Sequence, residues 1–165
     1  MTAYECVRDL IGKYSERDPF ELAEAEGICL RFKNLGSLQG LYFFAEERAF
    51  ILINEGLCEE KQRMICAHEL GHHFLHRDLS GTVFSETALF DMTGRPEIEA
   101  NLFAAELLLT DEEVLSSGEE YDFYAMASIL NVYPEFLLFK LRSMNQRGFC
   151  IPLPEECKNS FWNKH

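Results

Sequence analysis

The spacing of hydrophobic positions changes along the chain and predicts where helices give way to strands. In residues 4–14, apolar side chains recur three or four positions apart, as on one face of an amphipathic helix. Asp18 followed by Pro19 then indicates the start of a second helix, because Asp caps helix N-termini and proline is tolerated in the first turn. Gly27 is a typical helix end, so this second helix is short.

The next segment changes to short apolar and aromatic runs separated by glycine, asparagine and charged residues. Runs of this length and composition predict strands. We expect three of them, at 28–32, 41–45 and 49–53. The last two are separated by only three residues, 46–48, and should form a hairpin.

Helical spacing returns at residue 59 and continues through most of the remaining chain. Residues 77–94 are rich in Ser, Thr, Gly and Asp and predict an irregular surface loop. Thr110 with Glu113 forms a capping-box pattern that predicts another helix start. The other expected helices cover 59–76, 96–109, 121–130 and 134–145.

This order of elements predicts an α+β fold, with a small three-stranded sheet packed on helices. We expect residues 1–110 to form the core domain and residues 111–148 to form a helical C-terminal subdomain packed on that core. Residues 149–165 contain Pro152 and Pro154 and predict an irregular tail. A chain of 165 residues with 47% hydrophobic residues can build such a core.

Charge and composition narrow the class of protein. The net charge of −13, from 15 Lys and Arg against 28 Asp and Glu, argues against direct nucleic-acid binding and suits a basic protein partner. No apolar run approaches the roughly 20 residues that span a bilayer, and the charged start lacks a secretory signal, so we expect no membrane partner and a cytoplasmic location. Six scattered cysteines without a CxxC pair predict free thiols in that compartment.

The candidate chemistry lies in the helix expected at 59–76, where His68, Glu69 and His72 form an HExxH motif. Two histidines four residues apart differ by about 40° around a helix, so both rings can bind one ion, and zinc suits neutral imidazole. Glu69 lies about 100° from His68 and therefore flanks the metal. From there it can act as the general base that takes a proton from water.

The same helix predicts two faces of different character. Apolar residues gather on one side, while the motif residues and His73 and His76 gather on the other. Gly71 is unfavourable inside a helix by about 1 kcal/mol, so we expect it to allow the close approach of a strand on the buried side. His76 lies about one turn beyond His72, which favours a hydrogen-bonding role behind the metal site over ligation.

Two histidines need a third ligand from elsewhere. An extended metzincin motif would require glycine and histidine at positions where the chain has Leu75 and Asp78, so that source fails. The helix expected at 96–109 is the better source, because Glu99 and Glu106 lie close to the edge of its apolar stripe. Geometry alone does not choose between these two glutamates, and Glu97 lies further round.

Several segments resemble the ImmA/IrrE family of metallo-endopeptidases. They are QGLYFF, INEGL, AHELGHHFLH, EIEANLFAAELLL and ASILNVYPEFLLFKLRSM, which lie in the family's order between about residues 38 and 144. The resemblance implies a minimal zincin-like core with a helical C-terminal subdomain. It also implies Glu69 as the base and His68, His72 and the Glu of the EAN segment, here Glu99, as ligands of zinc, with manganese as an alternative metal.

The resemblance further implies a substrate, because family members typically cleave or inactivate a helix-turn-helix repressor of a mobile element, prophage or stress regulon. The expected partner is therefore such a repressor. The alternative to an enzyme is a non-catalytic anti-repressor or a toxin–antitoxin-type module that only binds its partner. The sequence does not indicate the oligomeric state, the cleaved bond or the activating signal.

Overall fold

We describe the fold from a computed structural model that covers residues 1–77, 84–86 and 94–154. The chain divides into two compact units, Met1–Leu108 and Leu109–His165. The boundary lies within two residues of the expected one. Each unit is described by itself.

The first unit contains four helices and four strands in the described residues. Their order along the chain is α1 (Ala3–Tyr14), α2 (Pro19–Ala25), β1 (Cys29–Lys33), β2 (Gly40–Ala45), β3 (Arg48–Asn54), α3 (Glu59–Leu75), β4 (Phe84–Glu86) and α4 (Arg95–Leu108). The expected α+β class is thereby confirmed. Asp18 caps α2 as predicted, since its side chain accepts hydrogen bonds from the backbone N–H groups of Phe20 and Glu21.

The sheet has the strand order β1-β3-β2-β4. β1 runs parallel to β3, whereas β2 is antiparallel to both β3 and β4. The predicted hairpin joins β2 to β3, and its turn residues Glu46 and Glu47 have φ angles of 50° and 62°. Two consecutive positive φ values are typical of the tight turns whose twist matches a hairpin.

The prediction of an irregular segment at 77–94 is wrong at one point, because β4 lies within it and adds a fourth strand. Its three residues pair with Gly40, Leu41 and Tyr42 of β2. A strand this short carries no period of its own, so only its pairing with β2 reveals it. Residues 78–83 and 87–93 of the predicted loop lie outside the described residues.

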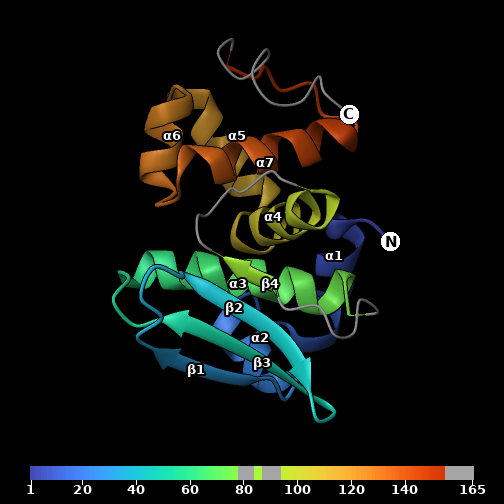
Figure 1. The fold of residues 1–165 in the computed structure, drawn as a ribbon. Helices are drawn as coiled ribbons and strands as arrows, with labels where there is room; N and C mark the ends of the chain where they lie inside the picture. Colours follow the sequence, from blue (N-terminus) through green and yellow to red (C-terminus); the bar gives the residue numbers. More distant parts are fainter. Residues whose placement is uncertain (78–83, 87–93, 155–165) are drawn as a thin grey trace. The chain divides into compact units, whose positions relative to one another are not determined.

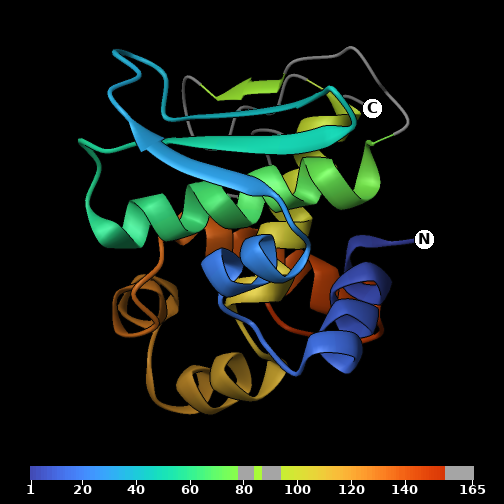
Figure 2. The ribbon, with the colours of Figure 1, turned by 90° about the horizontal axis from the view of Figure 1, so that it is seen from below.

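α3 lies between the sheet and α4, as Figures 1 and 2 show from two directions. The second half of α3, from Met64 to His73, is buried on all sides. The ionisable side chains of this half of α3, His68, Glu69, His72 and His73, are therefore buried together with its apolar side chains.

Two consecutive residues before α2 connect the helices that carry the site. The Arg17 guanidinium donates hydrogen bonds to the backbone carbonyls of Glu106 and Leu107, 2.7 Å and 3.1 Å away, at the C-terminal end of α4. The Asp18 carboxylate forms a salt bridge with Arg63 of α3. Arg17 thus holds the C-terminal end of α4, and Asp18 holds the first half of α3, from the same loop.

The second unit contains α5 (Asp111–Glu120), α6 (Phe123–Ile129) and α7 (Pro134–Gln146). Thr110 forms the predicted capping box with Glu113 at the start of α5. The core of this unit consists of apolar side chains from all three helices and from the segment before α5. They are Leu109, Val114, Met126, Ala127, Leu137, Leu141 and Met144.

Two expectations from composition can be compared with the structure. Five cysteines lie in the described residues, and all five are free thiols, as predicted. Among the described residues, no helix combines the length and the apolar character that crossing a membrane requires.

Candidate metal centre

The close contact between α3 and α4 builds the centre. A Cβ atom added to Gly71 would lie 2.8 Å from Cα and 3.0 Å from the carbonyl oxygen of Ala100, closer than real Cβ atoms pack. Gly71 therefore allows the close approach of α4, and the expectation that it faces a strand is wrong. Glu97 and Asn101 flank Ala100 on α4, so this contact brings both of them over α3.

Three ligand atoms converge where the helices meet. The Nε2 atoms of His68 and His72 lie 3.1 Å apart. Oε2 of Glu97 lies 3.2 Å from the first and 3.4 Å from the second. Both histidines are 1% exposed, whereas the Glu97 side chain is 24% exposed, so the group is reached from the Glu97 side.

The third member of the converging group is thus Glu97. The prediction that Glu99 faces the two imidazoles is wrong. The Glu99 carboxylate lies 3.0 Å from Nε2 of His76 and accepts a hydrogen bond from Arg95. Glu106, the other expected candidate, is buried but does not belong to the converging group, which comprises His68, His72 and Glu97 among the described residues. The physical reason is the rotation of α4 about its axis.

That rotation is set by small side chains. The prediction assumed that Ile98, Leu102, Ala105 and Leu109 form the buried stripe of α4. In the structure Ala105 and Leu109 are buried as predicted, but Ile98 and Leu102 are only partly buried. Other residues of α4 are 0% exposed in their place: Ala100, Phe103, Ala104 and Leu107. The small residues Ala100 and Ala104 let the helix backbones approach, and that turns Glu97 and not Glu99 toward the histidines.

The dimensions of the group fit a divalent cation. Zinc binds imidazole nitrogen and carboxylate oxygen at about 2.0–2.1 Å, so neighbouring ligands of a tetrahedral site lie about 3.3–3.4 Å apart. The three distances between His68, His72 and Glu97 are 3.1, 3.2 and 3.4 Å. Three protein ligands from two helices leave the fourth position of a tetrahedron for water or substrate.

Burial keeps the ligands in the form that binds a metal. Desolvation lowers the pKa of His72 to about 4, although Glu97 partly opposes this shift. The imidazole of His72 is therefore neutral at pH 7, as a ligand must be. Burial raises the pKa of Glu97, but the hydrogen bonds with His68 and His72 outweigh it and hold that pKa well below its usual range.

The far side of each imidazole also has a partner. Nδ1 of His68 lies 3.0 Å from Oδ1 of the fully buried Asn101, and Nδ1 of His72 lies 3.2 Å from Nδ1 of His76. The expectation that His76 lies behind the site agrees with this contact. Asn101 was not predicted, although its place four residues after Glu97 puts both on one face of α4.

Glu69, the expected general base, is 1% exposed and lies on the side of α3 that faces β2. A Cβ atom on Gly40 of β2 would lie 2.6 Å from Oε1 of Glu69 and 2.4 Å from Cγ2 of Ile65. Gly40 therefore leaves the room that the Glu69 carboxylate occupies. His73, which follows His72 on α3, lies with its Nδ1 at hydrogen-bonding distance, 3.2 Å, from the Tyr42 hydroxyl.

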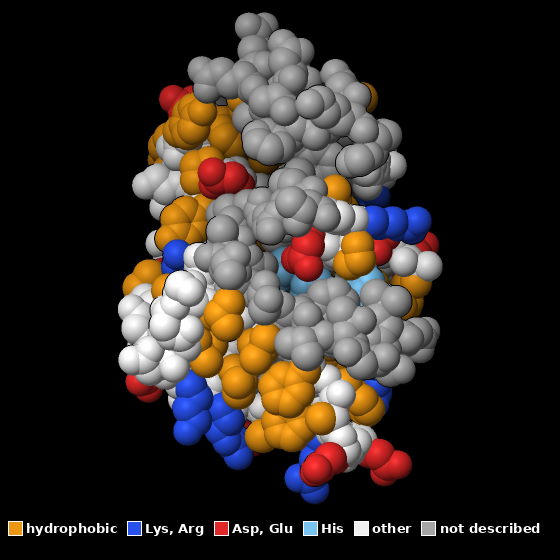
Figure 3. All heavy atoms as spheres, viewed as in Figure 1, with side chains coloured by type: hydrophobic (Ala, Val, Ile, Leu, Met, Phe, Trp, Pro, Cys, Tyr) orange, Lys and Arg blue, Asp and Glu red, His pale blue; other side chains and the backbone are white. Residues whose placement is uncertain are grey.

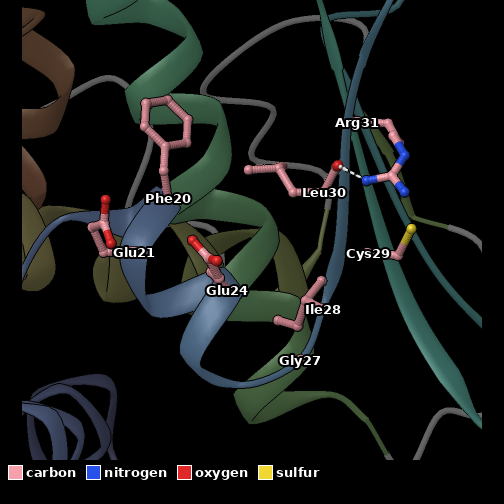
Figure 4. A pocket seen from close by; sticks show the side chains of 8 residues that line it. All are labelled: Phe20, Glu21, Glu24, Gly27, Ile28, Cys29, Leu30 and Arg31. Atoms are coloured by element: carbon pink, nitrogen blue, oxygen red, sulfur yellow. Dashed lines mark hydrogen bonds between the residues drawn. The ribbon is translucent and has the colours of Figure 1, made fainter.

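The surface of the first unit shows the centre and a separate hollow. Figure 3 shows histidine side chains beside an acidic side chain in the region of α3 and α4. A separate hollow between α2 and β1 is lined by Phe20, Glu24, Leu30 and Arg31 among others (Figure 4). In that hollow the Arg31 guanidinium donates a hydrogen bond to the Leu30 carbonyl. The residues that line it do not include His68, His72 or Glu97.

Comparison with known proteins identifies a matching family model and related proteins. The model of the IrrE N-terminal-like domain, peptidase M78, matches residues 23–142. Metallopeptidase ImmA of Bacillus subtilis (strain 168) is 33% identical over 138 residues, which cover 79% of this chain and 78% of ImmA. A protein of Bacillus phage phi105 named uncharacterized immunity region protein 2 is 38% identical over 106 residues, 64% of this chain and 66% of the phage protein. The chain thus matches just under two thirds of the phage protein's length.

Proposed function

The chain belongs to the ImmA/IrrE family of metallopeptidases, and we propose from this premise that it is itself a zinc-dependent endopeptidase. The observation that carries the proposal is the convergence of His68, His72 and Glu97 at distances of 3.1–3.4 Å. Three electron-pair donors this close repel one another unless a cation or protons lie between them. A divalent cation satisfies all three at once.

His68, His72 and Glu97 would hold the metal, with zinc favoured by two imidazoles and manganese as the alternative. A bound zinc ion supplies Lewis acidity, which lowers the pKa of water and polarises a peptide carbonyl. Asn101 accepts a hydrogen bond from Nδ1 of His68 when that atom carries the proton. The Nε2 lone pair of His68 then points toward Glu97 and His72.

Glu69 is the residue we assign as general base. Its position next to His68 on α3 puts it beside the ligands without making it part of the converging group. Glu69 would take a proton from the attacking water and deliver it to the leaving amine, so that the peptide bond breaks and the two products together gain one water. The absence of a side chain at Gly40 leaves the space that this carboxylate occupies.

We assign a helix-turn-helix repressor as the substrate. The support is the relationship to metallopeptidase ImmA and to a phage immunity-region protein, since immunity depends on a repressor. The net charge of −13 suits a basic, DNA-binding substrate, because opposite charge speeds association. Cleavage of such a repressor would release the genes it controls.

The test is to incubate the purified, zinc-loaded chain with purified helix-turn-helix repressors of the same genome and to measure intact masses. The wild-type chain should produce two fragments whose masses sum to that of the repressor plus one water. Glu69→Gln should keep the zinc but cleave about 10²–10⁴-fold more slowly, the usual loss for a general base. Glu97→Gln should lose both zinc and cleavage.

The same experiment distinguishes cleavage of the repressor from the non-catalytic alternative. If Glu69→Gln retains zinc and relieves repression in cells as fully as the wild-type chain, the protein acts by binding the repressor and not by cleaving it. An intact repressor after incubation with zinc-loaded wild-type chain would point the same way.

A further inference from the structure

His72 is connected to the surface by a row of three further side chains. Nδ1 of His72 lies 3.2 Å from Nδ1 of His76, and Nε2 of His76 lies 3.0 Å from Oε2 of Glu99. The other oxygen of Glu99 accepts a hydrogen bond of 2.8 Å from Nε of Arg95. Side-chain exposure rises along the row, from 1% at His72 to 6%, 33% and 87% at the three partners.

When Nε2 of His72 binds a metal, the proton of that ring lies on Nδ1, and one placement of the remaining protons then satisfies the contacts of this row. Arg95 can only donate, and an ionised carboxylate can only accept, so Nε2 of His76 must donate to Glu99. Glu99 forms an ion pair with Arg95 through one carboxylate oxygen and faces Nε2 of His76 with the other. With its proton on Nε2, His76 has a lone pair on Nδ1 that accepts a hydrogen bond from Nδ1 of His72.

The consequence reaches the metal centre. When Nδ1 of His72 carries the proton, its Nε2 carries the lone pair, and this is the atom that lies 3.4 Å from Glu97 and 3.1 Å from Nε2 of His68. Hydrogen bonds on the far nitrogen of a ligand histidine commonly fix its tautomer and ring orientation. Here the carboxylate is that of Glu99, and it acts on His72 through the imidazole of His76.

We propose that Glu99 and His76 are positioning residues, which act in series to hold His72 in the tautomer that presents Nε2 to the metal. The proposal rests on the proposed function, because it assigns Nε2 of His72 as a metal ligand. It gives Glu99 a role beside the centre although Glu99 does not touch it. His68 is held differently, by the single buried amide of Asn101.

The experiment measures zinc affinity of the full chain by competition with a chelating dye, with circular dichroism to check folding. His76→Phe removes the acceptor for His72 and should weaken zinc binding about 10–100-fold, the usual loss when such an outer partner is removed. His76→Asn keeps an acceptor near the position of Nδ1 and should restore much of the affinity. Arg95→Ala removes only an exposed ion pair and should change affinity less than about threefold.

A double-mutant cycle tests the serial order. Glu99→Ala should weaken zinc binding in the wild-type background but should cost nothing further in the His76→Phe background. Nitrogen-15 NMR of the histidine rings in the zinc-loaded chain supplies a second readout. The Nδ1–H of His72 should exchange slowly with solvent in the wild type and faster in Glu99→Ala.

The outcomes separate this proposal from the proposed function. If the wild-type chain binds zinc and both Glu99→Ala and His76→Phe bind it equally well, the positioning role is wrong and the metallopeptidase assignment stands. Additive losses in the double variant would also overturn the serial arrangement. If the wild-type chain itself binds no zinc, the proposed function fails, and this inference fails with it.

Discussion

Gly40 of β2 lies against the carboxylate of Glu69 on α3, so closely that a Cβ atom on Gly40 would come within 2.6 Å of Oε1. The nearest atoms belong to the ends of two side chains, Glu69 and Ile65, and not to the backbone. A larger residue at position 40 can therefore be accommodated if Glu69 moves. The position of the general base thus depends on a glycine in the sheet.

The first prediction follows from this contact. Gly40→Ala should displace Glu69 and reduce the cleavage rate at least about tenfold, because small displacements of a catalytic group are costly. Zinc affinity should change less than about threefold, since the three atoms nearest to the added Cβ belong to Ile65 and Glu69 and not to His68, His72 or Glu97. Parallel measurements of cleavage rate and zinc affinity check this. Equal losses of both would show that Gly40 supports the fold and not the base.

The second prediction uses one substitution at two helical glycines. Gly71→Ala should lower the free energy of unfolding by about 1–3 kcal/mol, because its Cβ would meet the backbone of Ala100 and force α3 and α4 apart. Gly12→Ala in α1 meets nothing within 4 Å and should raise that free energy by up to about 1 kcal/mol. Denaturant unfolding of both variants provides the measurement. Stabilisation by Gly71→Ala would contradict the close packing that sets the position of Glu97.

The third prediction concerns how the stability of the metal-free protein depends on pH. Burial lowers the pKa values of His72 and His73 to about 4, against about 6.5 in an unfolded chain. The unfolded chain therefore binds more protons between pH 4 and pH 6.5, so the stability of the metal-free protein is full above about pH 6.5 and falls as the pH decreases toward 4. Each histidine should contribute a loss of about 2 kcal/mol between pH 7.5 and pH 5.

Urea unfolding of the metal-free chain at a series of pH values measures this loss. His73→Gln should reduce the pH dependence, because it removes one of the two buried imidazoles and leaves the other. A stability that stays constant from pH 7 down to pH 5 would contradict the burial of neutral imidazoles in α3.

The fourth prediction concerns the helical unit. Asp111 forms salt bridges with Arg147 at 2.6 Å and with the buried Lys140 at 2.7 Å. The hydrogen bond from Arg147 is the main cause that holds the pKa of Asp111 well below its usual range. Asp111→Asn would remove a countercharge of the Lys140 ammonium, whose side chain is 2% exposed, and should destabilise this unit by about 3 kcal/mol.

Thermal unfolding compares Asp111→Asn with Asp122→Asn, a substitution at an exposed helix cap where asparagine caps as well as aspartate. The first should lower the melting temperature by several degrees and the second should leave it nearly unchanged. Equal, small shifts would show that Lys140 finds another partner.

Much of the architecture follows from local patterns in the sequence. The apolar runs at 28–32, 41–45 and 49–53 correspond to β1, β2 and β3 because short aromatic and branched runs bounded by turn residues have few other ways to fold. The HExxH helix and the Thr110 cap are equally local. β4 is not, because its three residues become a strand only by pairing with β2.

For a related reason, the sequence alone could not decide which glutamate of α4 joins the two histidines. Glu97 and Glu99 lie two residues apart on α4, about 200° round the helix, so the rotation of α4 decides which of them faces His68. That rotation depends on Ala100 meeting Gly71, a contact between two helices distant in sequence. The large apolar side chains of α4 pointed to another face. A stripe of small residues on α4 is the sequence signal that favours Glu97.

The central claim is that His68, His72 and Glu97 hold one metal ion, and anomalous diffraction at the zinc edge tests it most directly. Crystals of the zinc-loaded full chain should show one anomalous peak about 2.0–2.1 Å from both Nε2 atoms and from an oxygen of Glu97. In that structure Glu99 should still contact His76. A peak bound by Glu99, or no peak between the two histidines, would contradict the account.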